Sequence, residues 1–123
     1  MASAILLADD EKDFVDTLGE RLELRGYAVR VVYDGISALA AAQEALPDIA
    51  IVDWLMPGKS GDAVLHELHA RQPHLPVILL TGHGARDDHG CTPCAEAFAC
   101  LTKPVALDTL LEQIQLALGG VQA

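Results

Sequence analysis

The sequence has few cysteines, few basic residues and no long apolar run. Its 123 residues include three cysteines, an odd number that does not suit a disulfide framework, and we expect reduced thiols. Lysine and arginine total 8 against 18 acidic residues, which gives a net charge of −10. That charge argues against nucleic acid or an anionic membrane surface as a direct partner. No apolar stretch reaches the roughly 18 residues of a membrane span and no secretory signal is present, so we expect a cytoplasmic domain.

Internal repeats, low-complexity tracts and linkers are also missing. Hydrophobic residues make up 51% of the chain, too many for a disordered acidic polypeptide. The length is that of one ordinary domain. We therefore expect residues 1–123 to form a single domain, with no effector domain in this chain.

Short apolar runs alternate with amphipathic segments along the chain. Five runs are candidate strands: residues 4–8, 29–33, 49–52, 77–80 and 99–101. Three of them are unbroken, which is typical of strands covered on both faces, whereas Arg30 in the second run favours an edge strand. Helical periodicity follows four of the runs, in segments containing Phe14–Leu22, Ile36–Ala42, Val64–Leu68 and Leu107–Leu118.

The alternation predicts an α/β fold with a parallel sheet and helices on both faces. Asp34 is placed to cap the second helix, and Gly26 to end the first. A fourth helix is expected between residues 85 and 98, but Gly90, Thr92 and Pro93 interrupt it. It either begins late, at Pro93, or is partly unwound.

Polar residues stand at the carboxyl ends of the predicted strands, where parallel α/β sheets bind ligands. Asp9 and Asp10 follow the first strand, Asp53 the third, Thr81 the fourth, and Lys103 the fifth. Three neighbouring carboxylates repel one another unless a cation offsets them, and an all-oxygen site suits Mg²⁺. Asp53 could then act as a nucleophile, with Lys103 and Thr81 serving the oxygens of a transferred phosphoryl group.

Four motifs in order resemble the receiver domain of two-component response regulators. They are Asp9-Asp10-Glu11, Asp53-Trp54-Leu55-Met56-Pro57-Gly58 with Gly61, Leu80-Thr81-Gly82, and Lys103-Pro104. The resemblance covers essentially the whole chain. It implies a flavodoxin-like (βα)5 three-layer sandwich with a five-stranded parallel sheet in the order 2-1-3-4-5.

The same resemblance implies a function. Asp53 would accept a phosphoryl group from a phosphohistidine of a sensor histidine kinase or histidine phosphotransfer protein. Mg²⁺ would be bound by Asp10 and Asp53, with Asp9 and the backbone carbonyl of Leu55. Thr81 would be the switch hydroxyl, Lys103 would pair with the phosphoryl group, and Lys103-Pro104 would be a cis peptide. The module would assist its own phosphorylation and dephosphorylation and would signal to an output protein or attached domain, rather than act as an enzyme.

Cysteines mark the departures from this family pattern. Cys100 stands three residues before the lysine, where the family usually has Tyr or Phe, and Glu96-Ala97 replaces the usual small-residue turn. Cys91-Thr92-Pro93-Cys94, with His89 and Cys100 nearby, resembles a redox dithiol or a zinc-ligating group. The alternative function is therefore a redox- or metal-responsive interaction module using Cys91, Cys94 and Cys100; the simpler interpretation is small thiols at packing positions.

Overall fold

Five parallel strands form one sheet in the order β2-β1-β3-β4-β5, as predicted. The structure is a computed structural model that describes residues 3–82 and 97–119. The strands are β1 (Ala4–Ala8), β2 (Ala28–Val32), β3 (Ile49–Asp53), β4 (Val77–Thr81) and β5 (Ala99–Thr102). Every residue of β3 and β4 is buried, as the unbroken apolar runs predicted. β2 is an edge strand, where exposed Arg30 forms an ion pair with Glu44 at 2.6 Å.

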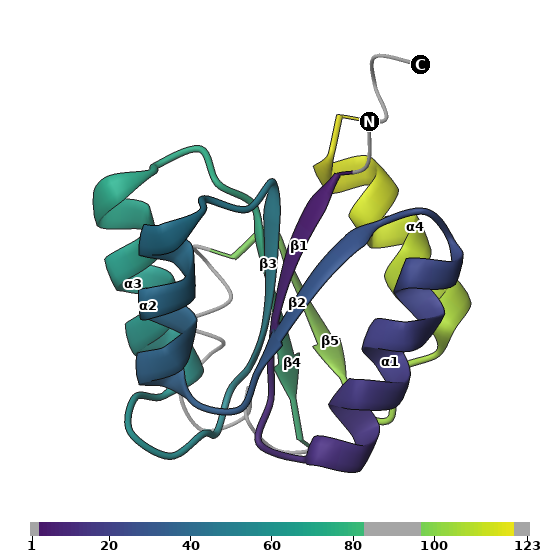
Figure 1. Ribbon diagram of the computed structural model, residues 1–123, viewed down its shortest axis with the longest axis horizontal. Helices are drawn as coiled ribbons and strands as arrows, with labels where there is room; N and C mark the ends of the chain where they lie inside the picture. Colours follow the sequence, from purple (N-terminus) through teal and green to yellow (C-terminus); the bar gives the residue numbers. More distant parts are fainter. Residues whose placement is uncertain (1–2, 83–96, 120–123) are drawn as a thin grey trace.

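Helices cover both faces of the sheet and complete three layers (Figure 1). They are α1 (Lys12–Leu24), α2 (Gly35–Glu44), α3 (Gly61–Arg71) and α4 (Leu107–Ala117). α1 and α4 lie on one face, and α2 and α3 on the other. The flavodoxin-like α/β architecture is thus confirmed. The helix predicted between residues 85 and 98, with Gly90, Thr92 and Pro93, falls mostly outside the described residues.

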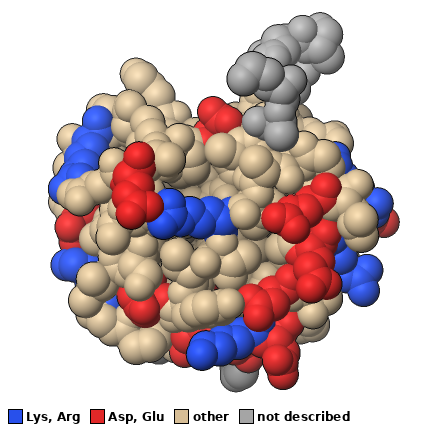
Figure 2. All heavy atoms as spheres, viewed as in Figure 1, with Lys and Arg blue, Asp and Glu red and all other residues tan. Residues whose placement is uncertain are grey.

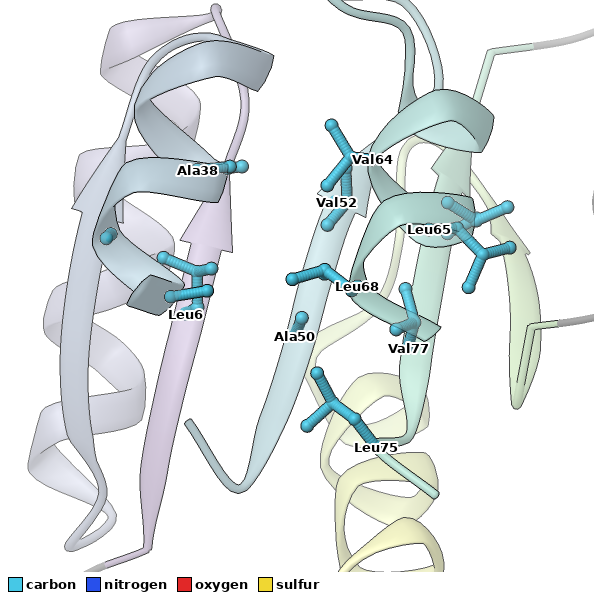
Figure 3. Packing of buried hydrophobic residues seen from close by; sticks show 13 residues of the cluster. Leu6, Ala38, Ala50, Val52, Val64, Leu65, Leu68, Leu75 and Val77 are labelled. Carbon is cyan, nitrogen blue, oxygen red and sulfur yellow. The ribbon is translucent and has the colours of Figure 1, made fainter. Parts of the chain in front are cut away.

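Two apolar clusters hold the layers together, because successive strand residues point to opposite faces of the sheet. On one face, strand residues such as Ala50 and Val77 pack against helix residues such as Leu68 of α3 (Figure 3). On the other face, Leu7 and its neighbours on the strands pack against α1 and α4, with Ile114 fully buried. The apolar clusters therefore pack against the strands of the sheet, and polar groups lie at the ends of the strands.

Local signals for helix ends are confirmed. The Asp34 carboxylate accepts a hydrogen bond from the backbone N–H of Ser37 at 2.7 Å, which caps α2. Gly26, two residues past the end of α1, has a φ of 99°, a left-handed conformation that glycine adopts without strain. In the part of the chain that the structure describes, none of the helices has the length and apolar character needed to cross a membrane.

Surface charge is unevenly distributed. Figure 2 shows acidic side chains gathered in a band over α1. The exposed acidic residues of that helix are Asp13, Asp16, Glu20 and Glu23. Part of the net charge of −10 is therefore concentrated on one helix face rather than spread over the molecule.

Candidate functional site

Three carboxylates converge at the carboxyl edge of the sheet, the lower edge in Figure 1. Asp9 and Asp10 follow β1, Asp53 ends β3, and these two strands are neighbours in the sheet. One oxygen from each carboxylate lies within 4.8 Å of the others. Asp9 and Asp53 are buried, whereas Asp10 is exposed. The predicted pocket is therefore present, with its mouth on the side of Asp10.

The backbone fixes the positions of these side chains, because they lie next to the last hydrogen bonds between the parallel strands. The N–H of Asp9 donates to the carbonyl of Val32 at 3.2 Å, and that of Trp54 to the carbonyl of Leu80 at 2.8 Å. The N–H of Glu11 in turn donates to Asp9 Oδ1 at 2.9 Å, which orients the Asp9 carboxylate. Hydrogen bonds to neighbouring strands thus fix the positions of the site residues.

The chain beyond Asp53 turns sharply and starts α3. The N–H of Gly61 donates to the carbonyl of Trp54 at 2.7 Å. A Cβ at residue 61 would lie 2.5 Å from the backbone oxygen of Asp53, so no side chain fits there. The glycine of the motif is needed for this close approach. Leu55 lies in the intervening loop with its side chain 70% exposed, and the metal-binding role of its carbonyl stays a prediction.

Lys103 reaches the acidic pocket from the segment that follows β5. Its Nζ lies 2.8 Å from Asp9 Oδ2 and 3.4 Å from Asp53 Oδ1. The lysine side chain is only 17% exposed, so its charge acts in a partly desolvated setting. The peptide bond between Lys103 and Pro104 is cis, as the resemblance implied.

Thr81 ends β4 and is buried beside these groups at the same sheet edge. The N–H of Lys103 donates to its carbonyl at 2.8 Å, which joins the ends of β4 and β5. The position of Thr81 therefore agrees with the sequence prediction, while its role as the switch hydroxyl stays a prediction.

The electrostatics of the pocket disfavour a charged Asp53. Burial is the largest cause and the Asp9 carboxylate the next, and together they raise the pKa of Asp53 from 3.8 to about 6 despite the opposing effect of Lys103. For Lys103, burial alone would lower the pKa, but hydrogen bonds to Asp9 and Glu11 outweigh it and hold the pKa above its ordinary value. The pocket therefore holds more negative charge than one lysine offsets.

The residues present fit a divalent cation. Asp9 Oδ2 is buried and, apart from the ion pair with Lys103, no described donor meets it in hydrogen-bond geometry. The available ligands are carboxylate oxygens, which hard cations such as Mg²⁺ prefer. A cation among Asp9, Asp10 and Asp53 would offset the burial of charge and the repulsion from Asp9, the two largest causes of the raised pKa of Asp53. This acidic triad is typical of the Mg²⁺ site of the receiver family that the sequence resembles.

Two residues near Lys103 were not predicted to take part. Glu11 Oε1 lies 2.6 Å from Lys103 Nζ, and the Phe14 ring centroid lies 4.9 Å from the same atom. Glu11 was noted as part of the motif Asp9-Asp10-Glu11, but no role was predicted for it. Nothing in its local sequence indicated a partner 92 residues away. Phe14 was assigned only to the apolar face of a helix.

Cys100 lies on β5, half-buried against the cluster that includes Val52 and Val64. It is disulfide-bonded, so the expectation of three reduced thiols is wrong for this residue. Cys91, Cys94 and His89, the other members of the predicted redox or metal group, lie outside the described residues.

Comparison with known proteins agrees with this geometry. The response regulator receiver domain family matches residues 5–115. Among curated proteins, the chain is 35% identical over 114 residues to the transcriptional regulatory protein GlrR of Escherichia coli, covering 93% of this chain and 26% of GlrR. It is 30% identical over 118 residues to the response regulator MprA of Mycobacterium tuberculosis, covering 96% of this chain and 51% of MprA. The chain thus spans about half or less of these relatives.

Solved structures are similar over nearly the whole chain. A response regulator receiver domain protein from Clostridium thermocellum superposes with a TM-score of 0.88 at 32% identity, covering 98% of this chain and 97% of that one. The chemotaxis response regulator CheY4 of Vibrio cholerae gives a TM-score of 0.85 at 27% identity, covering 95% and 99%. By its fold, its acidic pocket and its sequence, the chain belongs to the response regulator receiver domain family.

Proposed function

We propose that this receiver is a phosphoacceptor switch of a two-component phosphorelay, with Asp53 as the phosphorylated residue. The observation that carries the proposal is the convergence of Asp9, Asp10, Asp53 and Lys103 at one sheet edge, with all three carboxylates within 4.8 Å. The phosphodonor is a phosphohistidine of a sensor histidine kinase or histidine phosphotransfer protein.

In the transfer step, an Asp53 carboxylate oxygen attacks phosphorus, a P–O bond forms, and the P–N bond to the donor histidine breaks. Asp53 is suited to this because its carboxylate is held at the sheet edge between Asp9 and Lys103, in a largely buried position. Lys103 supplies positive charge to the phosphoryl oxygens, and the Thr81 hydroxyl donates a hydrogen bond to one of them. Asp9, Asp10, Asp53 and the carbonyl of Leu55 would hold Mg²⁺, which would supply positive charge to the transferred group.

The output follows from the switch rather than from turnover of a separate substrate. The module assists its own phosphorylation and dephosphorylation, and its surface signals to an output protein or attached domain. GlrR and MprA are described as a transcriptional regulatory protein and a response regulator, and the chain spans only part of each. An attached regulatory domain is therefore one form that the output can take.

A direct test uses Mg²⁺ and the small phosphodonor acetyl phosphate. We expect an acid-stable, base-labile mass gain of one phosphoryl group, abolished by Asp53→Asn and by removal of Mg²⁺. Asp48→Asn is the matched control, because Asp48 lies just before β3, at the opposite end of the strand from Asp53. No mass gain under conditions that phosphorylate another receiver would contradict the proposal, and so would an equal gain in Asp53→Asn.

A second candidate function is favoured by one observation, the disulfide bonding of Cys100. In this alternative the chain is a redox- or metal-responsive interaction module that uses Cys91, Cys94 and Cys100. Alkylation of the native protein without reductant, together with a metal-content measurement, tests it. Three freely alkylated cysteines and no bound metal would count against this function.

A further inference from the structure

The ammonium group of Lys103 has three carboxylate neighbours, and the closest is Glu11 rather than Asp53. Nζ lies 2.6 Å from Glu11 Oε1, 2.8 Å from Asp9 Oδ2 and 3.4 Å from Asp53 Oδ1. A lysine ammonium has three N–H donors and no more. The longest of its three contacts is therefore with the residue that receives the phosphoryl group.

Two residues at the start of α1, Glu11 and Phe14, contact this ammonium group. Glu11 is the N-cap residue of α1, and Phe14 lies in the first turn of that helix. The ring centroid of Phe14 lies 4.9 Å from Nζ, within the range of a cation–π contact. Glu11 and Phe14 thus hold Lys103 from the α1 side, while Asp9 and Asp53 hold it from the pocket.

The carboxylate partners of Lys103 differ in how easily their ion pairs with it can be broken. Asp9 is fully buried, and its Oδ1 is already fixed by the N–H of Glu11. The Glu11 side chain is 63% exposed, so its carboxylate can turn into water and be hydrated there. When a phosphoryl oxygen on Asp53 requires a donor from Lys103, Glu11 is the partner that can be exchanged.

We propose that Glu11 is a positioning residue that acts as a latch on Lys103. In the unphosphorylated protein it occupies one donor of the ammonium, and a phosphoryl oxygen must displace it. This inference rests on the proposed function, because it requires Lys103 to contact a phosphoryl group on Asp53. Releasing the latch therefore tightens the binding of a phosphoryl group to the pocket.

Beryllofluoride, which mimics a phosphoryl group on a carboxylate, measures this effect without turnover. The wild-type chain, Glu11→Gln and Glu20→Gln are titrated with it in the presence of Mg²⁺, and the bound fraction is read by ¹⁹F NMR. Gln keeps the size of Glu11 but replaces its ion pair with a neutral hydrogen bond, and we expect about two- to fivefold tighter binding. Glu20→Gln removes the same charge from an exposed position farther along α1 and leaves the affinity unchanged.

Removing a negative charge near the pocket also raises its affinity for an anion, because repulsion is reduced. A double-mutant cycle separates this effect from the latch. Lys103→Met and the double variant Glu11→Gln/Lys103→Met are titrated at higher fluoride concentration. The latch predicts that the gain from Glu11→Gln disappears when Lys103 is absent. An equal gain in both backgrounds would assign the effect to the local field and overturn the latch.

A second readout observes the contact itself. In the Mg²⁺-free protein, we expect the side-chain ¹⁵N resonance of Lys103 to shift in Glu11→Gln and to stay in place in Glu20→Gln. Unchanged Lys103 resonance and unchanged beryllofluoride affinity in Glu11→Gln would refute the latch while leaving the proposed function intact. Wild-type protein that binds no beryllofluoride at all would instead overturn the proposed function, and the latch with it.

Discussion

Replacing Asp53 with Asn should stabilise the Mg²⁺-free protein, although it removes the residue on which the proposed function depends. The pKa of Asp53 is raised from 3.8 to about 6 by burial and by the Asp9 carboxylate. The folded chain therefore holds a proton on this residue more readily than the unfolded chain does. Asn, which is neutral and of similar shape, does not carry the cost of a buried negative charge.

The magnitude follows from linkage between protonation and folding. A pKa difference of one corresponds to about 1.4 kcal/mol, so ionised Asp53 lowers the free energy of unfolding by about 3 kcal/mol at pH 7.5. The cost shrinks as the pH falls from about 6 towards 4, because the folded protein then becomes protonated first. At pH 4.5 it amounts to about 1 kcal/mol. The advantage of Asp53→Asn should therefore grow by about 2 kcal/mol between pH 4.5 and pH 7.5.

Urea denaturation with a chelator present, at both pH values, measures this difference. Asp108→Asn is the control, because Asp108 is exposed at the start of α4, and we expect its effect to stay within about 0.5 kcal/mol. Saturating Mg²⁺ should stabilise the wild type more than Asp53→Asn, because the variant lacks one of the three carboxylates. An advantage of Asp53→Asn that is the same at pH 4.5 and pH 7.5 would refute the reasoning.

Two further predictions concern the scaffold, and both are measured by urea denaturation. Asp34→Ala removes the cap on Ser37 N–H and should lower the free energy of unfolding by about 1 kcal/mol; no loss would show that the cap is dispensable. Gly61→Ala drives a Cβ to 2.5 Å from the Asp53 carbonyl oxygen and should cost about 1–3 kcal/mol. Gly82→Ala is the control, because no atom of the described residues lies within 4 Å of its Cβ, and equal losses in the two glycine variants would contradict the steric argument.

Much of the fold could be predicted because the signals are local. The unbroken apolar runs of β3 and β4 and the Arg30 interruption in β2 report directly how many faces of each strand are covered. Asp34 and Gly26 act within a few residues of the helix ends that they define. The convergence of Asp9, Asp10 and Asp53 could also be predicted, since parallel strands bring their carboxyl ends to one edge.

The partners of Lys103 could not be predicted, because they depend on side-chain placement between distant segments. The strand-end rule brings Lys103 to the right edge of the sheet, but it does not say which of several carboxylates the ammonium contacts. Glu11 makes the shortest contact, at 2.6 Å, and it does so from the residue immediately before α1. The disulfide bonding of Cys100 was missed for a similar reason, since the count of cysteines carries no information on their separation in space.

The hydrogen bonds from Asp9 N–H to Val32, from Trp54 N–H to Leu80 and from Lys103 N–H to Thr81 have a consequence for how this domain can move. They tie the main chain at these strand ends to the neighbouring strands of the sheet, so the reacting groups keep fixed positions relative to one another. A charge arriving on Asp53 cannot spread these strands without breaking the ladder. A rearrangement around Asp53 therefore involves side chains such as Lys103 rather than the main chain of these strand ends.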